Sequence, residues 1–462
     1  MHPAFVMRSK AALPIFFVTP ASVTKTAAGL GKAARVFIKA AGFEAKPGQH
    51  LILPGPRGIA GVLFGIEPRK AAANPFLPGL LPGVLPSGTY RFANAPHDAR
   101  LGALAFALGS YRFTKYRKAA PRPVRLALPA GIDGVELSRI AHAVTIARDL
   151  INTPTNDMGP AELETAARAL AKPYGAKVRS IVGDGLLKES FPLIHAVGRA
   201  AAKTAAPRLI DLRWGKTGDP KVTLVGKGVC FDTGGLDIKS DQAMLLMKKD
   251  MGGAATVLAL AQMIMDRKLK LQLRVLIPAV ENSIDGGAFR PLDVYRSRKG
   301  VTVEVGNTDA EGRLILADAL ALADEEKPDL LVDMGTLTGA ARVALGPELP
   351  PFYTDDEALA AELARHAAAE NDPLWRLPLW RRYESMLDSK TADTSNIASG
   401  GMAGSIICAL FLKCFVSAAK SWLHFDIYAW TPAARPGRPE GGECQAARAL
   451  YALLKKRYGS GA

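Results

Sequence analysis

Residues 301–317 read VTVEVGNTDAEGRLILA and join a strand-like pattern to a helix-like one. Apolar residues alternate over 301–305, which predicts a strand, and the apolar run after Arg313 favours a helix. Asp309 and Glu311 lie between the two patterns. Acidic side chains between a strand end and a helix start project into the crevice where parallel sheets bind ligands. The stretch therefore predicts a ligand site in an α/β fold.

The two carboxylates of this stretch, Asp309 and Glu311, are close enough in sequence to repel each other. They stay ionised together only where cations neutralise them, and the single guanidinium of Arg313 does not suffice for both. A divalent metal ion is the natural candidate. The alternative is structural: Asp309 caps the helix, and Glu311 in the first turn interacts with the helix dipole. Taken alone, the stretch leaves both interpretations open.

A second cluster of charged residues lies upstream, within residues 222–239. The apolar run 222–226 predicts a buried strand, and the glycines that follow permit sharp turns and close backbone approach. Lys227 and Asp232 lie in this apolar context, where a lysine is unusual unless it is paired. They form either a buried ion pair that stabilises a loop or part of a ligand site.

Asp250 is a third acidic position, directly before a helix-like apolar run. On its own it is more typical of a helix cap than of a metal ligand. Together, the predicted strand ends and helix starts carry four carboxylates and two lysines: Asp232, Asp250, Asp309, Glu311, Lys227 and Lys239. Oxygen-rich sites suit Mg²⁺ and Mn²⁺, and Zn²⁺ also accepts carboxylates. Four acids can serve two ions, an arrangement that suits hydrolysis at a carbonyl group.

Several uncommon motifs, in order along the chain, resemble those of the leucine aminopeptidase family, the cytosolic two-metal aminopeptidases. They are RDLINTPTN at 148–156, VGKGVCFDTGG at 225–235, DMGGAA at 250–255, NTDAEGRL at 307–314 and DMGTLTGA at 333–340. The likeness covers roughly residues 135 to 430. It implies a leucyl-type enzyme that removes the N-terminal residue of a peptide with water activated by two divalent ions, Mn²⁺ or Zn²⁺. It also implies a cytoplasmic protein that assembles as a homo-hexamer.

The resemblance implies a role for each charged residue of the cluster. Asp232 and Glu311 would bridge the two metals. Asp309 would bind one ion, and Asp250 and the side-chain amine of Lys227 would complete the other site. An amine ligand must be neutral, so the pKa of Lys227 would have to be low, and metal proximity and burial both act in that direction.

Two further residues would take part in the reaction. The resemblance implies that Lys239 polarises the scissile carbonyl and stabilises the oxyanion, and that Arg313 holds a bicarbonate-like anion that relays a proton. The free amine of the substrate would bind the second metal and Asp250, which restricts hydrolysis to the N-terminal residue. Five positions fall where the family lines its substrate pocket: Met247, Asn307, Thr336, Leu337 and Gly339.

The sequence departs from the family's pattern near its C-terminus. The family usually has a glycine-, alanine- and threonine-rich turn before its last helix, near the pocket for the substrate's first side chain. Residues 440–446 here read EGGECQA, and the loop after residues 393–396 is short. These departures leave the metals and the mechanism untouched but put the preference for leucine in question.

Strand-like and helix-like segments alternate along the second part of the chain. Strands are expected at 222–226, 272–279, 301–305, 329–334 and 423–428. Such alternation predicts an α/β fold with a mainly parallel sheet flanked by helices on both faces.

The first part of the chain mixes short apolar runs, including an expected strand at 12–18, with a helix-like run at 99–108. This mixture predicts a smaller α/β domain. We therefore expect an N-terminal α/β domain at 1–130, a connecting helix at 131–152, and a larger catalytic domain at 153–462.

The formal net charge of +16 raises a hypothesis from another class, nucleic-acid binding. Residues 111–125 hold six basic residues and no acid, interleaved with aromatic residues, a pattern that single-strand binders use. A solvated basic face explains the same segment and is the favoured interpretation. A two-metal phosphatase is a weaker third alternative, because no stretch resembles a phosphate-cradling loop.

The remaining composition is that of a globular protein. No apolar run reaches the roughly 18 residues that suggest a membrane span, so we expect no membrane partner. The four cysteines lack paired spacing, which is typical of reduced thiols in a cytoplasmic protein. The seven histidines show no paired metal spacing, so the expected site is built from carboxylates and lysines.

Overall fold

The computed structural model describes residues 1–459 except 8, 10, 57, 69–72 and 118–121, and these form two compact units. The first unit comprises Met1–Thr145 and Ala433–Glu440, and the second comprises Ile146–Pro432 and Gly441–Ala462. The boundary between them falls inside helix α5, Gly134–Asn152. The return of a late segment, Ala433–Glu440, to the first unit had no counterpart in the sequence patterns.

The first unit is built on a six-stranded sheet with the strand order β1-β6-β5-β2-β4-β3. Neighbouring strands pair in parallel, except that β3 and β4 are antiparallel. The strands are β1 (Phe5–Val6), β2 (Leu13–Val18), β3 (His50–Gly55), β4 (Gly58–Gly65), β5 (Gly88–Phe92) and β6 (Val124–Ala127). The helices are α1 (Val23–Gly29), α2 (Lys32–Ala40), α3 (Leu81–Val84) and α4 (Ala99–Gly109). The strand expected at 12–18 and the helix expected at 99–108 are thus confirmed as β2 and α4.

The second unit contains a nine-stranded sheet in the order β16-β15-β18-β14-β9-β11-β8-β7, with β10 paired to β11. Its strands are β7 (Lys177–Val182), β8 (Arg208–Trp214), β9 (Lys221–Gly226), β10 (Gly228–Asp232), β11 (Gln272–Asn282), β14 (Leu330–Gly335), β15 (Pro351–Tyr353), β16 (Trp375–Arg376) and β18 (Trp422–Asp426). The central strands β18, β14, β9 and β11 are mutually parallel, whereas β8 and β7 continue the sheet in antiparallel pairing. The strands expected at 222–226, 272–279, 329–334 and 423–428 are confirmed as β9, β11, β14 and β18.

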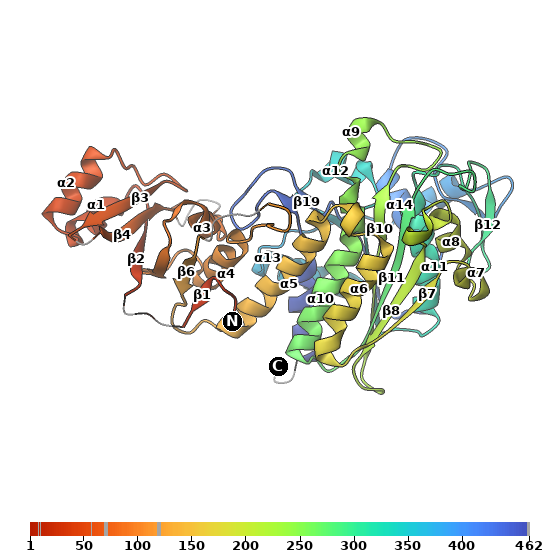
Figure 1. The fold of residues 1–462 in the computed structure, drawn as a ribbon, viewed down its shortest axis with the longest axis horizontal. Helices are drawn as coiled ribbons and strands as arrows, with labels where there is room; N and C mark the ends of the chain where they lie inside the picture. The colour runs from red at the N-terminus through yellow and green to blue at the C-terminus, as the bar shows by residue number, and fades with distance from the viewer. Residues whose placement is uncertain (8, 10, 57, 69–72, 118–121, 460–462) are drawn as a thin grey trace. The chain divides into compact units, whose positions relative to one another are not determined.

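Helices cover both faces of this sheet (Figure 1). On one side α10 lies against β9, β11 and β14 and packs on α6 and α15, and α15 packs on α13. On the other side α11 lies against the same strands, with α8 and α14 beside it. These helices are α6 (Pro160–Ala171), α8 (Pro192–Gly198), α10 (Gly252–Arg267), α11 (Glu311–Asp324), α13 (Glu357–Ala369), α14 (Gly404–Lys413) and α15 (Ala447–Tyr458). Nearly every residue of α10 and α11 is buried, as expected of helices enclosed between a sheet and outer helices.

The strand expected at 301–305 was assigned to the wrong sheet. It forms β13 (Thr302–Glu304), which pairs with β12 (Val294–Arg296) and β17 (Thr394–Ser395) in a separate three-stranded sheet. Its alternating pattern predicted a strand correctly, but alternation does not specify a partner, because pairing is decided by distant parts of the chain.

Glycine allows α10 to approach the sheet closely. A Cβ atom on Gly253 would lie 2.2 Å from the carbonyl oxygen of Met334, and one on Gly226 would lie 2.7 Å from the Cα of Ala254. The backbone of Lys227 fixes this approach, because its N–H donates to Met334 and its carbonyl accepts from Ala254, each over 2.9 Å. The end of β9 is therefore held against both β14 and α10.

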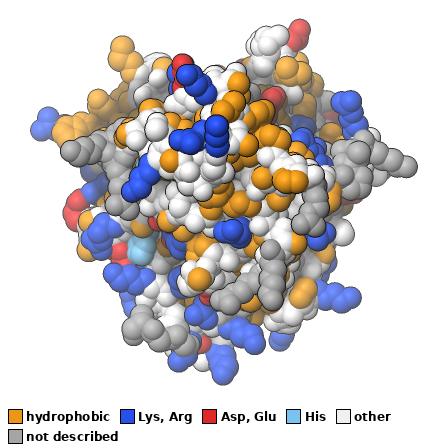
Figure 2. All heavy atoms as spheres, turned by 90° about the vertical axis from the view of Figure 1, so that its left-hand side faces the viewer, with side chains coloured by type: hydrophobic (Ala, Val, Ile, Leu, Met, Phe, Trp, Pro, Cys, Tyr) orange, Lys and Arg blue, Asp and Glu red, His pale blue; other side chains and the backbone are white. Residues whose placement is uncertain are grey.

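The predicted fold class is confirmed: a small N-terminal α/β domain is followed by a larger domain with a mainly parallel, helix-flanked sheet. Among the described residues, no helix has the length and apolar character that crossing a membrane requires. Figure 2 presents a face of the first unit on which Lys and Arg side chains are scattered rather than gathered into one patch, with few acidic side chains among them.

Candidate metal centre

The predicted site residues lie at one edge of the central sheet. Strands β9, β10, β11 and β14 are linked by parallel pairing, so their carboxyl ends meet at that edge. Lys227 directly follows β9, Asp232 is the last residue of β10, Asn282 is the last residue of β11, and Thr336 follows β14. This is the edge at which open α/β sheets bind ligands.

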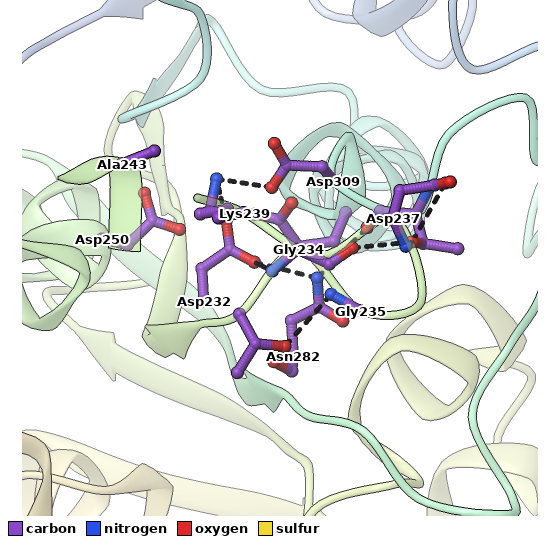
Figure 3. A network of polar contacts seen from close by, with 12 residues as sticks. Asp232, Gly234, Gly235, Asp237, Lys239, Ala243, Asp250, Asn282 and Asp309 are labelled. Atoms are coloured by element: carbon purple, nitrogen blue, oxygen red, sulfur yellow. Dashed lines mark hydrogen bonds and ion pairs between the residues drawn. The ribbon is translucent and has the colours of Figure 1, made fainter. Parts of the chain in front are cut away.

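Three carboxylates converge there from two distant segments. Each of Asp232, Asp309 and Glu311 offers an oxygen, and the three oxygens lie within 4.8 Å of one another. Asp232 comes from the end of β10, whereas Asp309 lies in the turn before α11 and Glu311 is the first residue of that helix. Figure 3 shows Asp232 and Asp309 directed toward Lys239, with the carboxylate of Asp250 nearby.

Two lysines link the four acids, and the partners differ from the sequence expectation. The Nζ of Lys227 lies 2.9 Å from Asp250 and 2.8 Å from Glu311, and it donates to the carbonyl oxygen of Thr336 over 2.8 Å. The Nζ of Lys239 pairs instead with Asp232, over 3.0 Å, and with Asp309. The suggested ion pair between Lys227 and Asp232 is therefore wrong.

The absence of a side chain at Gly312 leaves space for the side chain of Lys227. A Cβ atom on Gly312 would lie 2.6 Å from the Nζ of Lys227, so a side chain at this position of α11 would displace the ammonium group. The glycine of the motif DAEGR thus permits the first turn of the helix to pack on Lys227.

The alternative that the acids serve as helix caps is not supported. Helix α11 has Ala310 as its N-cap and α10 has Met251, and neither helix has a side-chain cap hydrogen bond. Asp309 and Asp250 each lie one residue before these caps. Their carboxylates point toward the lysines instead.

Asp232 is oriented by residues that sequence reasoning missed. Its Oδ1 accepts from the N–H of Gly234 and from the side-chain amide of Asn282, each over 2.9 Å. The amide of Asn282 also donates to the carbonyl of Thr308, which ties the end of β11 to the turn before α11. A polar residue that ends a long apolar strand was the available signal for Asn282.

A second contact joins the loop after β10 to the same turn. The N–H of Asp237 donates to the hydroxyl of Thr308 over 2.8 Å, and the carboxylate of Asp237 accepts from the N–H of Thr308 over 2.8 Å. The hydroxyl of Thr308 also donates to the carbonyl of Gly234. The loop that carries Lys239 is therefore fixed on the segment that carries Asp309 and Glu311.

Asp250 is held from the side of β14. It lies in a short 3₁₀ helix, Met247–Met251, and its Oδ1 accepts from the hydroxyl of Thr336 over 2.6 Å. The same hydroxyl also contacts the backbone carbonyl of Asp250. Lys249, which precedes Asp250, is 2% exposed, and its Nζ lies 4.7 Å from the centre of the Tyr428 ring.

Arg313 is a buried residue of the first turn of α11, two positions after Glu311. Its Nη1 donates to the carbonyl of Asn396 over 2.7 Å. The side chain of Asn396 accepts from the N–H of Gly306 and donates to the carbonyl of Asn307, and the side-chain oxygen of Asn307 in turn accepts from the N–H of Asp309 over 2.7 Å. Asn307 thus shapes the turn before α11. Sequence reasoning assigned no role to Asn396, although it is the last residue of the segment 393–396 named above.

The remaining predicted pocket residues lie around Asp250 and the start of helix α12, Gly339–Leu345. Met247 begins the 3₁₀ helix that holds Asp250. The N–H of Leu337 donates to Asp426 over 3.1 Å, and Gly339 is the first residue of α12. These residues therefore belong to segments that adjoin the acidic cluster.

The electrostatics of the cluster are dominated by excess negative charge. Burial and the charge of Asp250 raise the pKa of Asp232 to about 6, and burial together with Asp232 raises the pKa of Glu311 well above its usual range. Burial also raises the pKa of Asp250, but Lys227 outweighs this effect and lowers it overall. The acids closest to one another therefore resist ionising together unless further positive charge is present.

The two buried lysines near the acids differ in the direction of their pKa shifts. Burial lowers the pKa of Lys227, but the charges of Asp250 and Glu311 outweigh burial and raise it above its usual value. Burial acts in the expected direction, but in the absence of metal ions it does not lower the pKa of Lys227 overall. Burial lowers the pKa of Lys249 to about 8 despite the nearby charge of Asp250.

Three buried oxygens of the acidic cluster have a lysine ammonium group as their partner and no other hydrogen-bond donor in the described structure: Asp250 Oδ2, Asp309 Oδ1 and Glu311 Oε1. Two ammonium groups thus serve four carboxylates, which leaves negative charge in excess. Metal ions bind carboxylate oxygens in such surroundings. The residues present therefore fit a divalent metal centre.

Two family models match the chain. The cytosol aminopeptidase family, catalytic domain, matches residues 145–451, and the M17 aminopeptidase, N-terminal domain, matches residues 13–129. A probable cytosol aminopeptidase of Caulobacter vibrioides is 36% identical over 446 residues, which cover 90% of this chain and 89% of the relative. One of Roseiflexus castenholzii is 39% identical over 366 residues, covering 75% and 74%.

Solved structures agree with these relatives. The cytosol aminopeptidase of Coxiella burnetii has a TM-score of 0.93 and 44% identity, with 98% of this chain and 99% of that chain covered. The bottromycin maturation enzyme BotP, in complex with Mn, has a TM-score of 0.86 and 32% identity, with 97% and 99% covered. Fold and site together define a metal-dependent aminopeptidase. The chain belongs to the cytosol aminopeptidase family, and the resemblance inferred from its motifs is confirmed.

Proposed function

We propose that the chain is a two-metal aminopeptidase in which Asp232 and Glu311 bridge the ions. Asp309 would hold one ion, and Asp250 with Lys227 would hold the other. The observation that carries this proposal is the convergence of three carboxylates within 4.8 Å, with a fourth beside them and two lysines to neutralise all four. Two ions held there supply Lewis acidity toward a carbonyl group and a nucleophile at neutral pH.

Lys239 is proposed as the donor that stabilises the oxyanion. Its Nζ lies between Asp232 and Asp309, and the side chain is 12% exposed, so the ammonium is fixed at the cluster while reaching its open side. A preorganised donor aimed at developing negative charge costs no reorganisation during the reaction. Loss of this charge should therefore act on the transition state rather than on metal binding.

Arg313 is proposed to hold a bicarbonate-like anion that relays a proton. One N–H of its guanidinium is committed to the carbonyl of Asn396, which fixes the plane of the group. A guanidinium presents five donors in a fork that matches planar oxyanions, so the other donors suit such an anion. Its place two residues after Glu311 supports a role beside the acids.

The substrate is proposed to be a peptide with a free N-terminus, whose amine is held by Asp250 and the adjoining ion. Met247, Asn307, Thr336, Leu337 and Gly339 would line the substrate pocket. Mn²⁺ or Zn²⁺ are the proposed ions, and the structure of BotP with Mn supports the first of them. We further propose a cytoplasmic homo-hexamer, as is typical of this family.

The test is a screen of chromogenic aminoacyl substrates against Mn²⁺, Zn²⁺, Mg²⁺ and Co²⁺, with a chelator-treated sample for comparison. The matched control is an N-acetylated substrate, which lacks the free amine. We expect metal-dependent release from the free-amine substrates only. Equal turnover of the acetylated substrate, or full activity after complete metal removal, would contradict the proposal.

A further inference from the structure

Lys249 carries a buried positive charge with no acidic ion-pair partner in the described part of the chain. It is 2% exposed, and its Nζ lies 4.7 Å from the centre of the Tyr428 ring. Lysine is almost never fully buried unless it is paired. The attraction of a cation to an aromatic ring is weaker than the cost of burying an ion.

A second cation faces the same ring. The guanidinium carbon of Arg342, from α12, lies 5.0 Å from the centre of the Tyr428 ring. One N–H of Arg342 donates to the carbonyl of Thr338 over 3.2 Å, which orients the group. Two cations and one phenol ring thus form a basic cluster, defined here as Lys249, Arg342 and Tyr428.

The acids nearest to this cluster are already engaged. Asp250 pairs with Lys227 and accepts from Thr336. Asp426 accepts four hydrogen bonds, from the backbone of Leu337 and Thr338 and from the hydroxyls of Thr338 and Ser405. The charges of both carboxylates act on Lys249, but neither forms an ion pair with Lys249 or Arg342 among the described residues. The two cations therefore suit an anion from outside the protein.

The segments that carry the basic cluster also carry or contact the proposed amine site and pocket of the substrate's first residue. Lys249 directly precedes Asp250, which would hold the substrate amine, and Arg342 lies in the helix that begins at the pocket position Gly339. Tyr428 follows β18 by two residues, and its neighbour Ala429 contacts the start of α10 beside Thr336. All three cluster residues therefore come from segments that carry the amine site or the pocket.

We propose that Lys249, together with Arg342, binds the side-chain carboxylate of the substrate's first residue, so that the enzyme favours peptides beginning with Asp or Glu. This inference rests on the proposed function and adds a substrate class to it. The alternative is that the basic cluster only stabilises packing around Tyr428, in which case an apolar first residue such as leucine remains the better substrate.

The test compares kcat/KM for isosteric pairs of chromogenic substrates, Glu against Gln and Asp against Asn. We expect the acidic member to be favoured by about 10- to 100-fold, the range that one hydrogen bond to a charged group provides. Lys249→Met should remove most of this preference. Lys248→Met is the matched control, because Lys248 is the adjacent lysine, lies over the ring of Trp430, and donates to the carbonyl of Asn152.

A wild-type enzyme that cleaves Gln or Leu substrates better than Glu would overturn the inference while leaving the aminopeptidase proposal intact. Absence of turnover on every substrate with every metal would contradict the proposed function instead. If Lys249→Met does not fold, the exposed Arg342→Gln is the second variant, and it should lower the Glu-to-Gln ratio; an unchanged ratio would count against the inference.

A measurement independent of turnover uses the reaction products. Calorimetric titration of the metal-loaded protein with L-glutamate and with L-glutamine compares two amino acids that differ only in the side-chain charge. We expect tighter binding of L-glutamate, lost in Lys249→Met and retained in Lys248→Met. Equal affinities for the two amino acids in the wild type would contradict the inference.

Discussion

The two ends of strand β11 place charged residues in opposite situations. Near its start, Arg274 donates to both oxygens of Asp211, over 3.2 and 2.7 Å, and Arg213 and Glu326 complete the group. At its end, about 26 Å along the strand, Asn282 contacts the acidic cluster. The group near the start of β11 has two arginines and two acids, whereas the cluster near its end has two lysines and four acids.

The charged group near the start of β11 needs no further cation, because its positive and negative charges are equal in number. Its ion pairs include a two-pronged contact between a planar guanidinium and a carboxylate, which satisfies both acid oxygens. At the other end, each ammonium group is shared between two acids, and three buried oxygens have no partner besides a shared ammonium group. A functional cation site is therefore recognised by unbalanced buried charge, and the mere presence of buried ion pairs does not identify one.

The largest expected effect comes from removing a bridging acid. Asp232→Ala or Glu311→Ala should lower turnover by at least about 10³-fold and abolish binding of at least one ion, since several kcal/mol of charge stabilisation would be lost. Metal analysis and kcat of the folded variants measure this. Asp211→Ala, in the charged group near the start of β11, is the control and should keep both ions and turnover. Full occupancy of both ions in the Asp232 and Glu311 variants would break the comparison.

The next largest effect is expected from removing a cation, which should lower kcat at the acidic cluster but only stability near the start of β11. Lys239→Ala should lower kcat by about 10²–10³, the usual loss for one oxyanion donor, with metal content unchanged. Arg313→Ala should be milder, and added bicarbonate should partly restore its activity. Arg274→Ala should instead lower the free energy of unfolding, by about 1–3 kcal/mol, without changing kcat. A Lys239→Ala enzyme with wild-type kcat would favour a purely structural ion pair.

Asp318 is a buried acid outside both charged groups, and it should make the free energy of unfolding depend on pH. Asp318, in α11, accepts from the backbone N–H groups of Leu193, Ile194 and Arg298, and burial raises its pKa to about 7. A raised folded-state pKa means that the stabilisation is present below pH 4 and is lost as pH rises toward 7.

Relative to Asp318→Asn, the wild type should therefore lose on the order of 2–4 kcal/mol of unfolding free energy between pH 4 and pH 7. Urea unfolding of both proteins at several pH values measures the difference. A difference that stays constant with pH, or that grows in favour of the wild type as pH rises, would show that the backbone hydrogen bonds keep Asp318 ionised.

The smallest effect is expected at the basic segment 111–125. Reversing the charges of Arg117, Lys118 and Arg122 should leave turnover unchanged; Lys118 lies outside the described residues. Little DNA binding is expected near physiological salt, as measured by titration at several ionic strengths. Tight binding by the wild type that weakens steeply with salt, and that the triple variant loses, would overturn the interpretation of a solvated face.

The position of the candidate site could be predicted because its residues lie in short sequence motifs. Asp232, Asp250, Asp309 and Glu311 each lie at a strand end or a helix start, and the period of the neighbouring residues locates those points. The partners of the two lysines were not predictable, because Lys227 reaches acids 23 and 84 positions away whereas Lys239 takes Asp232 and Asp309. Asn282 and Asn396 were missed for the same reason.

The sequence by itself determined the α/β class, four strands of the central sheet, and the set of charged residues at its edge, because periodicity and motif spacing are local properties. Only the tertiary structure decided that β13 joins another sheet, that Ala433–Glu440 belongs to the first unit, and that Lys249 and Arg342 face one aromatic ring. These outcomes depend on packing between segments far apart in the chain, where burial and charge balance, rather than local pattern, select the partner.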